Sequence, residues 1–253
     1  MYDVTILSLL QGVTEFLPVS SSGHLVIAQN LLGVKEGSMR LDLFLHFGTL
    51  LAICAYYFSS IRRVVAGFDW RFMLKILVSA VPATVVYFTF RARIDAAFQD
   101  PHTVGAFLMF TGAVLMITRY LPAGGKDVSF FRAFLMGVAQ SFAILPGVSR
   151  SGLTLAAART GKVESSKAAE FSFLMSAPLI AGGCLMELAK IADTPEIAQI
   201  GEISWGLTAY GVGLSFLTGL FSLALLEKAL KSRWFWLFGP YCIIAGLFTL
   251  FLI

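Results

Sequence analysis

Six long apolar segments constrain this chain more than any other feature of its sequence. A helix needs about 20 mostly apolar residues to cross the hydrocarbon core of a bilayer. Only 13% of the 253 residues are charged, against about 25% in soluble domains. The sequence therefore predicts one all-α polytopic membrane domain over residues 1–253, in contact with membrane lipids. The expected spans are Leu41–Ser60, Phe72–Phe90, Thr103–Tyr120, Ala168–Leu188, Ser204–Leu226 and Trp234–Leu252.

Two further stretches, Leu7–Leu32 and Phe131–Thr160, are apolar at both ends but interrupted in the middle by Pro, Ser and Gly. Neither half of either stretch is long enough to cross a bilayer. Irregular backbone at membrane depth is tolerated only where protein or a water-filled cavity surrounds it. Both stretches are therefore predicted to be re-entrant helix–loop–helix hairpins.

The basic residues lie between the apolar segments and predict the topology. Six spans and two re-entrant hairpins place all four basic segments on one side, which the positive-inside rule makes cytoplasmic. Because the net charge of +4 comes from these loops, it indicates no nucleic-acid partner. Met1-Tyr2-Asp3 lacks the basic start of a signal peptide. The basic segments contain Arg62, Arg63, Arg71 and Lys75; Lys126 and Arg132; Lys162 and Lys167; and Lys228, Lys231 and Arg233.

An internal repeat is visible at an offset of 128 residues, shared by Pro18 with Pro146 and by Asp42 with Glu170. It predicts two units, about 1–122 and about 128–253, each with one hairpin and three spans. Three is an odd number, so the second unit is inverted relative to the first. Inverted repeats with broken helices place their site near the midplane, where the two units meet.

The first hairpin loop has the features of an anion site. Pro18 disfavours helical geometry at Leu17, so the first half-helix should end there. Ser20 or Ser21 is suited to cap the next helix, whose free N–H groups and dipole favour an anion. A capped turn without function is the simpler alternative.

The second loop repeats this arrangement with Ser149, Ser151 and Gly152 and adds Arg150. The planar guanidinium of Arg matches phosphate in a bidentate geometry. Alternatively, the Arg150 side chain could extend to the membrane interface (snorkel). This is less favoured, because Arg150 lies in the middle of the loop and not at a helix end. The two loops are therefore expected to meet at one phosphate-binding site.

Several ionisable residues have two interpretations. Glu15 would be functional, since charges inside a membrane are costly, or would only pair with Arg150. His24, three residues after Ser21, is a candidate acid, base or nucleophile, although a lone buried His is commonly structural. His46 lies four residues after Asp42, where a structural hydrogen bond is favoured over support of the site. Glu170 is interpreted as a polar anchor rather than as a residue that orients Arg150. His102 is assigned no role, and Cys54, Cys184 and Cys242 predict neither a disulfide nor a metal site.

The motifs resemble a known family. The segment from Gln11 to His24, QGVTEFLPVSSSGH, is similar to the first signature of the bacitracin-resistance type of undecaprenyl-diphosphatase, and the segment from Gly137 to Thr154 to the second. Glu170-Phe171-Ser172-Phe173-Leu174 with Pro178 resembles a third stretch. The resemblance implies an inverted repeat in the bacterial inner membrane, often dimeric. It also implies removal of one phosphate from undecaprenyl diphosphate, which recycles the lipid carrier of cell-wall synthesis and gives bacitracin resistance.

The resemblance also implies roles by position. Glu15 would in addition bind a divalent cation, Mg²⁺ or Ca²⁺. Gln11 stands where some relatives have a second Glu, which weakens a two-carboxylate metal site, and Cys242 follows Tyr241 where some relatives have Arg. The catalytic set is Glu15, Ser21, His24 and Arg150, and the expected substrate-binding residues are Gln11, Ser20, Ser22, Gly23, Ser149, Ser151, Gly152 and Thr154.

Other functions are weighed against this one. A polyprenyl-phosphate flippase or transporter would suit an inverted repeat, but transport needs no nucleophile beside a base. A structural scaffold leaves the two ionisable loops unexplained. A second class of lipid phosphatase needs a His after the Ser-Arg pair, and no His follows His102. The sequence does not decide whether Ser21, His24 or water attacks the phosphate.

Overall fold

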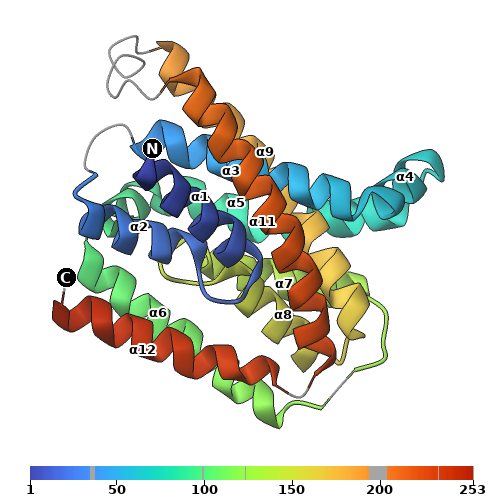
Figure 1. Cartoon of the computed structure of the whole chain (residues 1–253). Helices are drawn as coiled ribbons and strands as arrows, with labels where there is room; N and C mark the ends of the chain where they lie inside the picture. The colour runs from blue at the N-terminus through green and yellow to red at the C-terminus, as the bar shows by residue number, and fades with distance from the viewer. Residues whose placement is uncertain (35–37, 99, 123, 194–203, 233, 253) are drawn as a thin grey trace.

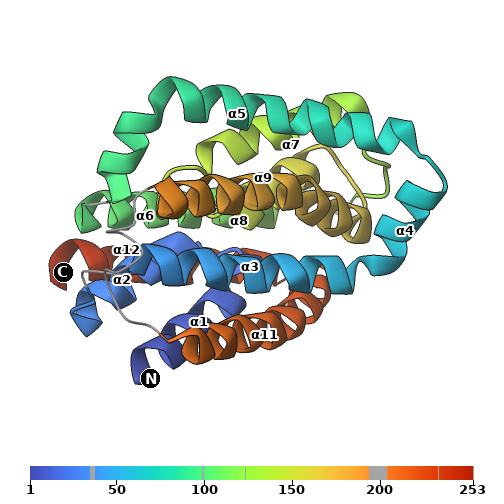
Figure 2. The ribbon, with the colours of Figure 1, turned by 90° about the horizontal axis from the view of Figure 1, so that it is seen from above.

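The computed structural model is mainly helical over the residues that it describes, which are 1–34, 38–98, 100–122, 124–193, 204–232 and 234–252 (Figures 1 and 2). Within these ranges there is no β-strand, only an isolated bridge between Lys126 and Val163. Short 3₁₀ turns occupy Thr118–Tyr120 and Phe235–Leu237. The α-helices are α1 (Tyr2–Phe16), α2 (Ser21–Leu32), α3 (Ser38–Tyr56), α4 (Phe58–Ala66), α5 (Trp70–Phe98), α6 (Pro101–Ile117), α7 (Phe130–Phe142), α8 (Arg150–Thr160), α9 (Ser165–Asp193), α11 (Trp205–Lys231) and α12 (Phe238–Leu252).

The apolar helices support an all-α membrane protein. In the described part of the chain, four helices are long and apolar enough to cross a membrane, or five if α3 and α4 count as one span. These two helices divide the predicted span Leu41–Ser60, because the chain bends by 69° between them. The predicted span Trp234–Leu252 is a 3₁₀ turn followed by the shorter apolar helix α12.

Helix α5 extends beyond its predicted end at Phe90. That residue leaves helical geometry (φ −117°, ψ 16°), and the helix continues past this kink to Phe98. Pro82, in contrast, lies inside α5 without ending it. The extension carries Phe98 to the cavity described below.

Two helix–loop–helix hairpins, α1–α2 and α7–α8, replace continuous helices in the two interrupted stretches. Helix α1 gives way at Leu17, which is extended (φ −65°, ψ 146°) as expected before Pro18. Ser20 caps α2 by accepting a hydrogen bond from the Gly23 N–H at 3.3 Å. Ser149 caps α8 in the same way, with the Gly152 N–H at 3.1 Å. Both loops therefore place a helix N-terminus directly after the Ser-rich motif.

The two halves of the chain are packed into each other. Helix α1 lies along α11, and α7 lies along α5, so each hairpin packs on a helix from the other half. Helices α6 and α12 also pack along their length. Their backbones approach closely at Gly105 and Gly246, where a Cβ on Gly246 would lie 2.5 Å from the Gly105 carbonyl oxygen. The core between the halves thus holds the hairpins in place.

The basic segments gather at one end of the molecule, on the side of α4 in Figure 1. The backbone at Lys126 bridges Val163, at the entrance of α7 and the exit of α8. Asp127 forms an ion pair with Lys167, and the Ser165 hydroxyl donates to the Leu230 carbonyl at 3.3 Å. The four basic segments therefore lie at one end of the fold, except for Arg233, which lies outside the described residues.

Glu170 accepts a hydrogen bond from Arg63 at 2.9 Å. It therefore serves as a polar anchor between α9 and α4, as expected, and does not orient Arg150. The three cysteines are free thiols, with Cys184 and Cys242 buried.

Candidate active site

The tips of the two hairpins meet, as the sequence predicts. The Ser151 hydroxyl donates to the Leu17 carbonyl at 3.1 Å. A Cβ on Gly23 would lie 3.1 Å from the Gly147 Cα. Loops 128 residues apart in the repeat thus form one continuous structure, and the helices that follow them begin beside each other.

The second loop is held from α6. Gly147 has φ +92°, and a Cβ there would lie 2.4 Å from the Val104 carbonyl oxygen, so the turn requires glycine. The buried Thr111 hydroxyl donates to the Gly147 carbonyl at 3.1 Å and accepts from the Ser149 N–H at 3.0 Å. These bonds fix the backbone immediately before Arg150.

The first loop is held through His24. Ser20 has the unusual φ of +69° for a non-glycine residue, and its carbonyl accepts from His24 Nδ1 at 2.8 Å. His24 Nε2 is then the acceptor for the Tyr241 hydroxyl at 2.7 Å. The imidazole therefore faces α12 and does not line the cavity beside Glu15. The expectation that it shares that cavity is wrong, because the Ser20 carbonyl and Tyr241 together turn the ring away.

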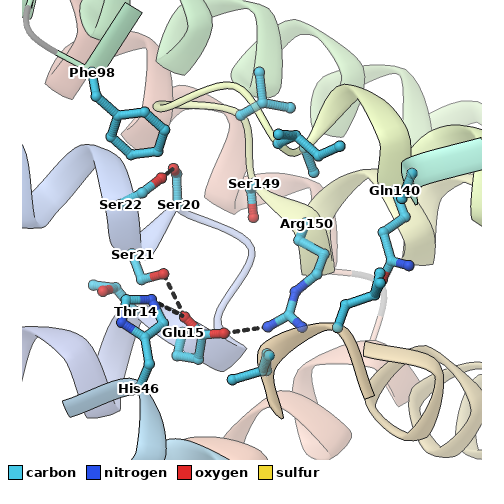
Figure 3. Close-up of a pocket in the computed structure, with 16 residues that line it drawn as sticks. Thr14, Glu15, Ser20, Ser21, Ser22, His46, Phe98, Gln140, Ser149 and Arg150 are labelled. Atoms are coloured by element: carbon cyan, nitrogen blue, oxygen red, sulfur yellow. Dashed lines mark hydrogen bonds and ion pairs between the residues drawn. The ribbon is translucent and has the colours of Figure 1, made fainter. Parts of the chain in front are cut away.

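A cavity of about 240 Å³ lies where the loops meet; we call it the central cavity (Figure 3). Glu15, Ser21 and Arg150 all line it, as predicted. Of the expected substrate-binding residues, Ser20, Ser22 and Ser149 line it as well. The remaining lining residues are Thr14, His46, Ala83, Phe98, Gln140, Ala143, Ile144, Val148, Leu179 and Ile180.

The other expected substrate-binding residues lie behind the residues that line the central cavity. Gln11 Nε2 donates to Glu15 Oε2 at 3.1 Å, and the Thr154 hydroxyl bonds the Ser172 hydroxyl at 2.7 Å. Gly23, Ser151 and Gly152 make the contacts between the loops. These residues therefore hold Glu15 and the two loops in position.

Glu15 is the centre of the polar network. Its Oε1 pairs with Nη2 of Arg150, and its Oε2 accepts from the Ser21 hydroxyl at 2.5 Å. The side chain is only 5% exposed, so its charge depends on these partners. A hydroxyl donating to a buried carboxylate has the geometry of a nucleophile beside its base. Figure 3 shows Ser21 and Arg150 approaching Glu15 from different loops.

For His46, the sequence favoured a structural hydrogen bond over support of the site. Its Nδ1 lies 2.7 Å from the Asp42 carbonyl oxygen, the structural hydrogen bond that was expected. Its Nε2 also lies 3.9 Å from Glu15 Oε2. His46 therefore belongs to the site as well as to the helix. Gln140 stands in the second motif but was assigned no role, and Thr111 was missed. Both are buried polar side chains in apolar helices, which is the signal that could have assigned them.

A comparison with known families identifies the chain. The model of the family described as bacitracin resistance protein BacA matches residues 4–248. The chain belongs to the BacA family. This membership agrees with the resemblance carried by the two Ser/Gly-rich motifs.

Relatives within the BacA family span the whole chain. A protein of Desulforapulum autotrophicum is 36% identical over 274 residues, covering 99% of this chain and 97% of its own. A protein of Thermotoga maritima is 36% identical over 247 residues, with 96% and 97% covered. One from Halothermothrix orenii is 34% identical over 258 residues, with 100% and 98% covered. Each of these relatives is named undecaprenyl-diphosphatase.

The donors present fit a divalent cation only together with a phosphate ligand. Among the described residues there is no group of three His, Cys, Asp or Glu that could hold a metal ion. Glu15 supplies the carboxylate of the central cavity, and Gln11 Oε1, beside it, is buried without a hydrogen-bond partner in the described part of the chain. Mg²⁺ is commonly bound by one or two carboxylates plus substrate phosphates. In this BacA family member, the cavity therefore offers one carboxylate and a nearby amide oxygen.

Proposed function

We propose that this protein is a membrane phosphohydrolase that converts undecaprenyl diphosphate to undecaprenyl phosphate and inorganic phosphate. The family and the names of its relatives support this substrate. The observation that carries the proposal is the Glu15 carboxylate, bonded by Ser21 from one loop and by Arg150 from the other. Such a reaction recycles the lipid carrier of cell-wall synthesis.

The central cavity suits a diphosphate headgroup. The first turns of α2 and α8 leave N–H groups without intrahelical partners, and both turns adjoin the cavity through Ser21, Ser22 and Arg150. Helix N-termini favour bound phosphate. Phosphoryl transfer needs mainly positioning and charge stabilisation, and Arg150 supplies a fixed positive charge.

The proposed chemistry breaks the bond between the bridging oxygen and the terminal phosphorus. Glu15 accepts the proton of the attacking hydroxyl, and undecaprenyl phosphate leaves. If Ser21 attacks, a phosphoserine forms, which water then hydrolyses; a water bound at Glu15 would attack directly. The position of His24 outside the central cavity favours these two routes over attack by its imidazole.

We also propose a divalent cation, Mg²⁺ or Ca²⁺, as the cofactor. Glu15, with the Gln11 amide oxygen nearby, would hold it together with diphosphate oxygens. When bound, the cation would neutralise part of the phosphate charge. Phosphate release measured with and without a chelator checks this proposal.

In the proposed membrane placement, six spans surround two re-entrant hairpins, in units of about 1–122 and 128–253. The exchanged packing of α1 on α11 and α7 on α5 supports two related units. The end that carries the basic segments would be cytoplasmic, in the inner membrane of a bacterium. A homodimer, which the family resemblance implies, stays a prediction for light scattering in detergent.

The prenyl tail needs space beyond the central cavity. A neighbouring apolar cavity of about 560 Å³ shares Thr14 with it and is lined by Val13, Leu17, Trp234, Phe238 and Tyr241, among others. We propose that the first isoprene units lie there, because a lipid substrate has no reason to leave apolar surroundings.

Release of inorganic phosphate from C55 diphosphate by the purified protein tests the proposed function. A phosphatase releases stoichiometric phosphate, and the variant Glu15→Gln does not. A flippase would move labelled lipid from one leaflet of a vesicle bilayer to the other without releasing phosphate, and that result would contradict the proposal.

A further inference from the structure

Gln140 is a buried amide without a partner at the wall of the central cavity. It lies in the last turn of α7, its side chain lines the cavity, and the residue is only 2% exposed. Both its amide oxygen and its amide nitrogen are closed off from solvent and make no hydrogen bond within the part of the chain that the structure describes. Figure 3 shows it on the opposite side of Arg150 from Glu15.

An unpaired amide is unusual in a folded protein. A buried polar group left without a partner costs about 1–3 kcal/mol, and the large majority have one. Exchanging the amide oxygen and nitrogen would not help, since both are unpaired. Gln29, by comparison, donates to both carboxylate oxygens of Asp42 at 2.9 Å. Gln140 thus carries a hydrogen-bonding capacity that the ligand-free fold does not use.

The neighbours of Gln140 indicate what would use it. The same cavity presents the Arg150 guanidinium and the Ser149 hydroxyl, both donors suited to phosphate oxygens. The terminal torsion of a Gln side chain is broad in energy, so a small rotation can present its NH₂ group to a bound anion. A phosphoryl oxygen would accept from that group without adding charge.

We infer that Gln140 is a phosphate-binding residue, whose amide N–H donates to a phosphoryl oxygen of a lipid diphosphate headgroup or of free phosphate. The inference rests on the proposed function for the identity of the lipid. It assigns the wall opposite Glu15 to substrate recognition, and that wall comes from the second hairpin.

The test replaces Gln140 by Met, which is similar in size but cannot donate. Removal of an unpaired buried amide should leave the melting temperature of the ligand-free protein unchanged or raise it. Turnover of C55 diphosphate should fall by about tenfold or more, and the thermal protection given by inorganic phosphate should shrink. Gln140→Glu keeps the shape and adds a negative charge, so both losses should be larger. Ser141→Ala, one residue along the same helix and outside the lining of the central cavity, is the matched control and should retain turnover.

The two probes separate the sources of phosphate. If both the thermal protection by phosphate and the turnover are lost, Gln140 makes a contact that free phosphate also makes. Loss of turnover alone supports a contact with the lipid headgroup. Wild-type turnover and protection in folded Gln140→Met, or a lower melting temperature with unchanged turnover per folded molecule, would overturn the inference. If the wild-type protein releases no phosphate from the lipid, the proposed function fails, while the protection arm still decides whether Gln140 binds phosphate.

Discussion

Replacement of Arg150 by Lys isolates the guanidinium geometry from its charge. The Arg150 side chain is 17% exposed and its Nη2 pairs with Glu15 Oε1. Its other guanidinium N–H groups make no hydrogen bond to the described part of the chain, so they are available to a phosphate. Lys can keep the ion pair with Glu15 but has no planar fork. The variant should therefore fold and lose at least one charge-assisted hydrogen bond to the substrate.

Such a bond contributes about 1.5–3 kcal/mol, which corresponds to a roughly 10- to 150-fold loss of kcat/KM. Phosphate release from C55 diphosphate in detergent or nanodiscs measures it, with the melting temperature as the check on folding. Arg159→Lys is the matched control: Arg159 lies in the last turn of the same helix, and its Nε donates to the Leu121 carbonyl at 3.2 Å, away from the central cavity. Wild-type turnover in a folded Arg150→Lys protein would refute the assignment of Arg150 to phosphate binding.

Three further substitutions test separate parts of the site. Ser21→Ala removes the hydroxyl on Glu15 and should slow phosphate release by about a hundredfold or more; a phosphoserine trapped in wild type by rapid acid quench would identify Ser21 as the nucleophile, and robust turnover by the variant would exclude it. Gly147→Ala forces a Cβ against the Val104 carbonyl at φ +92° and should destabilise the fold by about 1–3 kcal/mol, read as a lower melting temperature, whereas Gly125→Ala, with open space around it, should not. Tyr241→Phe removes the hydroxyl on His24 Nε2 and should change turnover by no more than about tenfold; a larger loss would place the His24–Tyr241 pair in the chemistry.

The arrangement of the two loops could be predicted because short-range rules and the repeat agree. Pro18 ends α1, and Ser20 and Ser149 cap the helices that follow, each for a reason visible within four residues. The repeat then requires the loops to meet, and the Ser151–Leu17 bond joins them. These predictions needed no knowledge of side-chain direction.

The side chains that the sequence misplaced depend on distant partners. His24 turns toward Tyr241, 217 residues away, and no local pattern contains that contact. The bend between α3 and α4 has no Pro or Gly to mark it; Tyr57 at the bend donates to Glu227 on α11 at 3.2 Å. Gln140 stands in the second motif, but only the position of the cavity reveals its side chain as part of the site.

The central claim is that the two loops form one catalytic site, and a double-mutant cycle tests it most directly. Phosphate release from C55 diphosphate is measured for wild type, Glu15→Gln, Arg150→Met, which removes the ion pair, and the double variant. Residues that act as a unit give strongly non-additive losses, and contacting residues are coupled by about 0.5–3 kcal/mol. The direct pairing of Glu15 with Arg150 predicts that the double variant is hardly slower than the slower single variant. Losses that multiply would mean that the two loops act independently, and would contradict a shared site.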